Sequence, residues 1–469
     1  MTDVRRSASR NTAPGDAAAK LRLTQRLGYG AGDMAFLLVW QGSALFLLYF
    51  YTDILGLSPY LAGAIFLSAM VWDAISDPLI ATWAERRAAR SGRYTPIIAW
   101  AALPMGVSYA MMFAIPFSAP VLMAIFALVS HLAFRTAYTF ASMPYNTLPA
   151  RLTANSDERS TLSALRLIGA ALGGFTAAIA TPAIVTSMAA QGEAMGYQTA
   201  ALFAGGLAAL VLFVSSQSVG ETLIVQPSPR TSHYWADFKA MWTSARGNTP
   251  FLRLLGVMAL ATIGYGFFTS SLLYFAQHVL QQPGLVTPIL GLSALATLLS
   301  APLWSVLATR TSKRTALIIG LGVAALGYLL FGLAPASQML WILGAAVIAG
   351  IGGAAIPVML WSMLPDTIDH AHARTGTRIE ARSFGLMTFV QKTMAGLTVL
   401  MAGGLLGLTG YSANSDPSPD ALVTIEAMVA WLPAIFMLAI IAVIRLYPID
   451  RDAHIKTLRA LDQTRSGSA

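Results

Sequence analysis

The sequence contains no cysteine, and charged residues are scarce in it. Without cysteine the chain has no disulfide, no thiolate nucleophile and no cysteine-ligated metal. Only 11% of its 469 residues are charged, compared with about 25% in an average soluble protein, and 56% are hydrophobic. The mean hydropathy is +0.63. Most of the chain is therefore expected to lie in a lipid bilayer.

Two ligand-binding signatures are also missing. No Gly-Lys-Ser or Gly-Lys-Thr phosphate loop occurs, which argues against transport driven directly by ATP. The histidines within the apolar part of the chain are scattered, and no two of them have metal-ligand spacing on one apolar run. They are His131, His278, His370 and His372. We predict no cofactor, and no metal site other than one for a sodium ion.

Long apolar runs make up most of the sequence. A bilayer core about 30 Å thick requires roughly 20 apolar residues per helical span, and an open sheet cannot cross it because unpaired backbone groups would meet hydrocarbon. We therefore expect an all-α membrane protein with twelve transmembrane helices. The runs lie at roughly 28–51, 58–84, 95–115, 119–145, 161–187, 198–216, 251–276, 286–309, 315–334, 338–364, 383–409 and 423–446.

Lysine and arginine gather in alternate connections between these runs. The connections after the second, fourth, sixth, eighth and tenth runs are basic, as are both tails, whereas the other six connections contain no Lys or Arg. By the positive-inside rule both termini are cytoplasmic and the number of spans is even. The net charge of +9 thus belongs to one side of a membrane and does not indicate nucleic-acid binding.

The runs form two groups of six. We expect a tail at 1–26, a six-helix bundle at 27–216, a cytoplasmic linker at 217–250, a second bundle at 251–446 and a tail at 447–469. The first run lacks a small-residue cleavage signature, which favours a retained span over a signal peptide. A short basic loop follows the second span of each group, so the two halves share the same pattern of spans and loops. Such halves place a substrate site between them, near the bilayer midplane.

A few ionisable residues lie inside the apolar runs and away from their ends, where charge is costly. A charge at the bilayer centre costs at least about 2.5–3.5 kcal/mol, so such residues normally face a bundle interior or an aqueous cavity and mark a pathway. The alternative is a set of buried ion pairs that only hold helices together. The residues on which the functional argument rests are Asp33, Asp73, Asp77, Arg135, Arg166 and Lys392.

Asp73 and Asp77 are four residues apart, which places both carboxylates on one face of a helix. Because like charges repel, at least one should be protonated or neutralised by a bound cation. Oxygen ligands suit a hard cation, and Ser76 and Thr139 are further oxygen donors. Direct salt bridges to Arg166 or Lys392 are the alternative. Both arrangements coexist if the basic side chain holds the empty site.

The fourth apolar run carries a polar stripe, because four polar residues recur at helical spacing on one face. Such a stripe lines a cavity rather than lipid. Its arginine, Arg135, can donate two parallel hydrogen bonds to a carboxylate or phosphate, unless it forms a structural ion pair with Asp33 or Asp77. The stripe consists of Arg135, Tyr138, Thr139 and Ser142.

Several short motifs follow one another in the order found in one family. In the first half they are Gly28 to Asp33, Tyr49 to Leu57, Trp72 to Pro78, Gly92 to Pro96, Met143-Pro144-Tyr145 ending the fourth span, and Asp157-Glu158-Arg159 in the next loop. In the second half they are Asp366 to Asp369, Thr375 to Glu380, and Gln391-Lys392. This chain resembles the glycoside–pentoside–hexuronide:cation symporters of the major facilitator superfamily over nearly all of residues 27–446.

The resemblance implies a major facilitator fold of two six-helix bundles and sodium- or proton-coupled symport of a sugar, glycoside or uronide. In the melibiose permeases of this family, the aspartates matching Asp73 and Asp77 hold the coupling cation, with the threonine matching Thr139 beside them. The lysine matching Lys392 lies close to that site. The residues matching Asp33 and Arg166 contact sugar hydroxyls. We expect the same roles here.

Three departures from the melibiose permeases bear on the substrate. Ser142 replaces a sugar-binding aspartate, and Asn146 replaces a tryptophan, which makes a galactoside doubtful. Ser76 replaces an asparagine, so sodium and proton both stay open. Arg135 replaces a glycine and adds positive charge to the expected substrate site, which also includes Ser142, Asn146 and Lys392. We therefore expect an anionic sugar to be favoured over a neutral galactoside.

Charges of both signs also gather in the loops after the fourth and tenth spans. By resemblance to the family, these residues form a cytoplasmic gate that closes when the cavity opens outward. The expected gate consists of Arg159, Asp366, Asp369, Arg378 and Glu380.

Two other functions are alternatives to sugar symport. The same fold could move a lysolipid or another amphiphile, as related branches do. An integral-membrane enzyme acting on lipid could use Asp73 and Asp77 as acid and base, but the sequence offers no nucleophile, base and orienting group to accompany them. The favoured interpretation is a monomeric, multi-pass transporter of the inner membrane, with a small-molecule substrate and membrane lipid as its partners.

Overall fold

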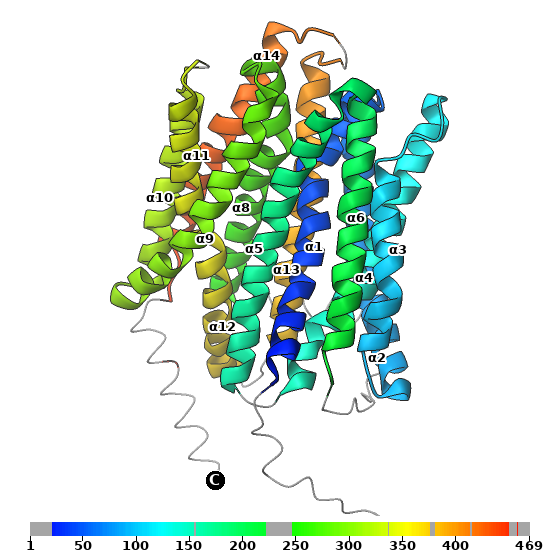
Figure 1. The fold of residues 1–469 in the computed structure, drawn as a ribbon. Helices are drawn as coiled ribbons and strands as arrows, with labels where there is room; N and C mark the ends of the chain where they lie inside the picture. Colours follow the sequence, from blue (N-terminus) through cyan, green and yellow to red (C-terminus); the bar gives the residue numbers. More distant parts are fainter. Residues whose placement is uncertain are drawn as a thin grey trace, which may run out of the picture.

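The computed structural model describes residues 21–153, 156–221, 246–335, 337–375, 380–412, 415–449 and 457. These residues form long helices that run side by side across the molecule (Figure 1), and no strand occurs among them. Twelve helical segments are long and apolar enough to cross a membrane. The predicted all-α architecture with twelve spans is confirmed.

Six spans form each half. The first half comprises α1 (Leu23–Tyr49, extended by the π-helix Phe50–Ile54), α2 (Pro59–Ser91), α3 (Thr95–Met112), α4 (Pro120–Leu152), α5 (Ser156–Ser187) and α6 (Glu193–Ser218). The second half comprises α8 (Thr249–Tyr274, with the π-helix Phe275–Val279), α9 (Val286–Arg310), α10 (Lys313–Gly332), α11 with α12 (Met339–Gly353 and Ala355–Thr375), α13 (Glu380–Leu408), and α14 with α15 (Pro419–Glu426 and Leu432–Arg445).

Several helices run past the limits expected from the sequence. The expectation that Met143-Pro144-Tyr145 ends the fourth span is wrong, because α4 continues through Pro144 and Pro149 to Leu152. Asp157, Glu158 and Arg159 likewise belong to the first turns of α5 rather than to a loop. Proline is tolerated inside a membrane helix because neighbouring groups satisfy the carbonyls that it leaves unbonded. Span ten instead divides at Ala354.

Glycines allow α1 and α5 to pack backbone against backbone. A Cβ atom on Gly169 would lie 2.0 Å from the carbonyl oxygen of Gly30, and one on Gly173 would lie 2.3 Å from that of Met34. Small residues at such positions let membrane helices approach closely. Gly169 and Gly173 therefore serve the packing of α5 on α1.

The two ends of the bundle differ in charge. We call the end where α2 gives way to α3 the basic end, because Arg86, Arg87, Arg90 and Arg93 lie there. At the opposite end, α2 of the first half packs against α13 of the second. A Cβ atom on Gly63 would lie 2.7 Å from Cα of Leu400, and one on Gly403 would lie 2.2 Å from the carbonyl oxygen of Pro59. The two halves are thus in backbone contact at the opposite end.

Candidate functional site

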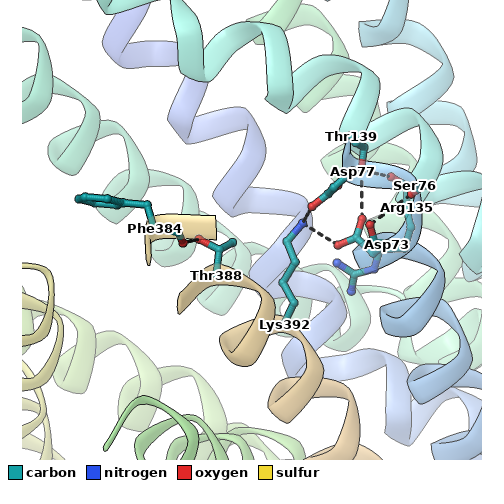
Figure 2. A network of polar contacts seen from close by, with 8 residues as sticks. All are labelled: Asp73, Ser76, Asp77, Arg135, Thr139, Phe384, Thr388 and Lys392. Carbon is teal, nitrogen blue, oxygen red and sulfur yellow. Dashed lines mark hydrogen bonds and ion pairs between the residues drawn. The ribbon is translucent and has the colours of Figure 1, made fainter. Parts of the chain in front are cut away.

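The carboxylates of Asp73 and Asp77 face the same point between α2, α4 and α13 (Figure 2). The hydroxyl of Thr139 on α4 lies 3.0 Å from Asp73 Oδ1 and 2.8 Å from Asp77 Oδ1. Lys392 on α13 places its ammonium 2.8 Å from Asp73 Oδ2 and donates a hydrogen bond to Asp77 Oδ2. We call these four residues the Asp–Lys cluster.

This cluster is shielded from water and spans both halves of the protein. The Asp73 side chain is fully buried, while Lys392 and Asp77 are 12% and 15% exposed. The single hydroxyl hydrogen of Thr139 can satisfy only one carboxylate at a time. The ammonium of Lys392 therefore carries most of the neutralisation. The arrangement combines both sequence-based alternatives: the acids share one site, and a basic side chain occupies it.

A second charged cluster lies on α1, α4 and α5. The Arg166 guanidinium donates to both carboxylate oxygens of Asp33, at 2.5 and 3.1 Å, and to the side-chain oxygen of Asn146 at 2.9 Å. The Tyr145 hydroxyl also donates to Asp33, at 3.0 Å. Asp33 is buried, whereas Arg166 is 31% exposed and Asn146 is exposed. This cluster offers both donors and acceptors at an accessible surface, as recognition of hydroxyl groups requires.

Arg135 joins neither cluster through an ion pair. Its guanidinium carbon lies 4.5 Å from the centre of the Trp40 ring. Arg166 pairs with Asp33 and Lys392 pairs with Asp77, so the alternative in which Arg135 pairs with either acid is not what the structure shows. Within the part of the chain that the structure describes, Arg135 has no ion-pair partner.

Two predicted site residues lie close to these clusters without touching their charged groups. Ser76 donates to the main-chain oxygen of Asp73, at 3.3 Å, rather than to a carboxylate. Ser142 is buried one turn beyond Thr139 on α4. The polar stripe on α4 is itself enclosed, since Arg135, Thr139 and Ser142 are 1%, 0% and 7% exposed.

The expected gate is only partly described. Asp366 on α12 pairs with Lys313 at the start of α10, with 2.7 Å between Nζ and Oδ2, a contact within the second half. Asp369 is half-buried one turn further along α12. Arg378 and the side chains of Arg159 and Glu380 lie outside the described residues. The gate thus stays a prediction.

A polar contact between the halves at the opposite end was not foreseen. The Thr52 hydroxyl lies 2.5 Å from that of Tyr274, and Tyr411 donates to buried Asp53 at 2.6 Å. Burial raises the pKa of the Tyr411 phenol far above its usual value, so the hydroxyl keeps the proton that it donates. His278 contacts the same hydroxyl at 2.8 Å. We call these five residues the opposite-end latch.

Trp40 and Tyr145 were also missed as site residues. Trp40 stands seven residues after Asp33, two helical turns along the same face of α1, a spacing that could have identified it. Tyr145 falls within a motif used for the family resemblance, but its contact with Asp33 depends on how α4 packs on α1. Both aromatic rings border the charged side chains of the site.

Comparisons with known proteins agree with this architecture. The family described as MFS/sugar transport protein matches residues 28–451. A putative glycoside/cation symporter of Escherichia coli K12 is 28% identical over 443 residues, covering 94% of each chain. A glucuronide carrier protein homolog of the same organism is 27% identical over 431 residues, covering 90% of this chain and 92% of its own.

Solved structures support the fold. The nucleoside transporter NupG aligns with a TM-score of 0.64 and 14% identity, covering 89% of this chain and 99% of its own. The chain is a multi-pass membrane transporter rather than an enzyme, and it belongs to the MFS/sugar transport protein family, within the glycoside–pentoside–hexuronide:cation symporters of the major facilitator superfamily.

Proposed function

We propose that this protein imports a sugar or glycoside together with a cation, by alternating access. The observation that carries the proposal is the ammonium of Lys392, from the second half, between the two carboxylates of the first half. Four carboxylate oxygens and the Thr139 hydroxyl converge there, an oxygen set that suits a sodium ion. A proton bound to either carboxylate could equally act as the coupling ion.

Coupling follows from the position of Lys392. A cation that enters the Asp–Lys cluster competes with the ammonium for the same oxygens, so α13 is less firmly held to α2. Ligand binding shifts the balance between two states only by its differential affinity for them. The cluster joins the halves through one basic side chain, which makes it sensitive to the bound cation.

The substrate site proposed here is the Asp33–Arg166–Asn146 cluster. Its donors and acceptors suit the hydroxyl groups of a sugar, and it lies in the same half as Asp73 and Asp77. The relatives named as a glycoside/cation symporter and a glucuronide carrier homolog support a sugar or glycoside as cargo. Arg135, Ser142 and Lys392 complete the proposed lining.

The basic end is proposed to face the cytoplasm, because basic loops remain on the side from which membrane proteins insert. The protein then lies in the inner membrane with both termini cytoplasmic and its opposite end facing outward. A monomer is sufficient, since both halves of the site come from one chain.

Transport by purified protein in proteoliposomes tests the proposed function. Separate inward gradients of sodium and of protons are imposed, and accumulation of radiolabelled glycosides is followed. We expect one gradient to drive uptake of unmodified sugar above equilibrium, and a collapsed gradient to abolish it. Equal final concentrations on both sides under either gradient would contradict symport.

The proposed cytoplasmic gate makes a separate prediction. Reversing Asp366 and Asp369 to lysine should weaken closure of the basic end, with each partly exposed pair contributing about 0.2–1 kcal/mol. Because the chain lacks cysteine, Thr388→Cys supplies a single labelling site on α13. We expect faster labelling from the cytoplasmic side in the reversed variant.

A charge swap provides the control for this experiment. Lys313→Asp combined with Asp366→Lys restores the local ion pair on α10 and α12 but still removes the acidic gate residue. Fast labelling in this swap as well would assign the effect to the gate. Labelling at the wild-type rate in the doubly reversed variant would remove Asp366 and Asp369 from it.

A further inference from the structure

Arg135 is a buried charge whose donors lack acceptors. Its Nε and Nη1 atoms have no hydrogen-bond partner, and the residue is 1% exposed. Trp40 and Phe134 contribute rings near the guanidinium, at 4.5 and 5.6 Å from its carbon. An unpaired charge in such surroundings is strongly unfavourable, and it persists in a protein when it has a use or acquires a partner.

The neighbouring acids are already engaged. Asp33 is held by Arg166 and Tyr145, and Asp77 by Lys392 and Thr139. The Asp73 carboxylate lies beside the Arg135 guanidinium (Figure 2), yet its two oxygens face Thr139 and Lys392. The three carboxylates of this region are matched by three basic groups, Arg135, Arg166 and Lys392, so their formal charges sum to zero.

Arg135 lies beside the Asp–Lys cluster and contacts the face of α1 that also carries Asp33. It is one turn before Thr139 of the Asp–Lys cluster on α4, and its guanidinium covers Trp40, which shares a helix face with Asp33. Figure 2 shows the guanidinium beside the Asp73 carboxylate. A substrate that binds Asp33 and Arg166 would reach Arg135 by extending about two turns, or about 10 Å, along α1 to Trp40.

We infer that Arg135 binds a carboxylate carried by the transported sugar, an inference that rests on the proposed function. A guanidinium forms charge-assisted, forked hydrogen bonds with a carboxylate, which supplies the acceptors that Nε and Nη1 lack. A bound cation raises the formal charge of the region to +1, and the carboxylate returns it to zero. Cation and anionic sugar thus increase each other's affinity reciprocally.

Matched sugar pairs test this inference. Binding of methyl glucuronide and methyl glucoside, and of methyl galacturonide and methyl galactoside, is measured on purified protein with and without the coupling cation. Wild-type protein should prefer the uronide of a pair by about 10- to 150-fold, the range expected for a hydrogen bond between charged groups. The cation should increase uronide affinity more than glycoside affinity.

Arg135→Gln should lower uronide affinity to that of the matching glycoside, and Arg135→Lys should retain part of the preference. Arg90→Gln, which removes an exposed charge at the basic end, should change neither. Arg135→Gln should also leave Tm equal to or above that of the sugar-free wild type, because it removes an unpaired buried charge. A residue that held the helices together would lower Tm instead.

The outcomes separate the inference from the proposed function. Equal binding of uronide and glycoside by the wild type would overturn the inference and leave sugar symport standing. An unchanged preference in Arg135→Gln, or a lower Tm with the preference intact, would also overturn it. Failure of every sugar to bind the folded wild type would overturn both.

Discussion

Replacing Asp77 by asparagine is expected to abolish cation-driven accumulation of substrate. The change removes one of the two carboxylates that share the Asp–Lys cluster and leaves Lys392 paired with Asp73 alone. Losing a charged ligand costs about 1.5–3 kcal/mol, or about 10- to 150-fold in cation affinity. Without a bound cation the ion gradient cannot drive transport of the sugar. Accumulation against the sugar gradient should therefore disappear, while exchange of sugar across the membrane continues.

Asparagine at position 73 should abolish accumulation as well, with an additional effect on stability. Asp73 is fully buried and its carboxylate lies beside the Arg135 guanidinium (Figure 2), whereas Asp77 is 15% exposed. Asp73→Asn leaves the Arg135 charge less compensated, so its Tm should fall below that of Asp77→Asn. Adding Arg135→Gln to Asp73→Asn should recover the Tm without restoring accumulation.

Paired uptake assays in one batch of liposomes measure both effects. Accumulation under an ion gradient is compared with exchange of labelled for unlabelled sugar at equal concentrations. Glu426→Gln is a matched control, because Glu426 is a carboxylate inside the last span that bonds to Trp431, away from the cluster. Sugar concentrated against its gradient by Asp77→Asn would remove Asp77 from the cation site.

The charged site residues could be identified from the sequence because a charge inside a membrane span is energetically costly and therefore rare. Ionisable residues in the middle of apolar helices need a reason, and the helical spacing of Asp73 and Asp77 places them on one face without knowledge of the fold. The same argument offered Arg166 and Lys392 as possible partners but could not choose between them, since Lys392 lies 315 residues beyond Asp77. Family resemblance favoured Lys392, and the contact itself depends on how the halves meet.

Arg135 shows a different limit of sequence analysis. The stripe on α4 predicted that its side chain faces inward, but periodicity does not determine which neighbour satisfies a buried group. Asp33 and Asp77 were reasonable partners, yet Arg166 and Lys392 reach them instead. The predicted end of the fourth span was wrong for a related reason. Proline is a strong helix breaker in water, but it is tolerated inside α4, because the surrounding helices satisfy the backbone groups that it leaves unbonded.

Valine in place of Gly403 should hold the opposite end open and stop transport. A Cβ atom there would lie 2.2 Å from the carbonyl oxygen of Pro59, and backbone cannot move aside as a flexible side chain can. Overpacking typically costs about 1–3 kcal/mol, which shifts a two-state balance by about 5- to 150-fold. The strain is relieved when α13 separates from α2, so the conformation with that end closed is penalised.

Gly404→Val is the matched control for this prediction, because a Cβ atom on the next residue would meet nothing within 4 Å. Val399→Cys, at the same seam, reports on opening through its reaction with an impermeant thiol reagent added from outside. We expect fast labelling and loss of turnover in Gly403→Val, with sugar binding retained, and wild-type behaviour in Gly404→Val. If both glycine variants transport at the wild-type rate, the α2–α13 contact does not have to re-form during the cycle, and the opposite end must be closed by the latch of Thr52, Asp53, Tyr274, His278 and Tyr411 alone.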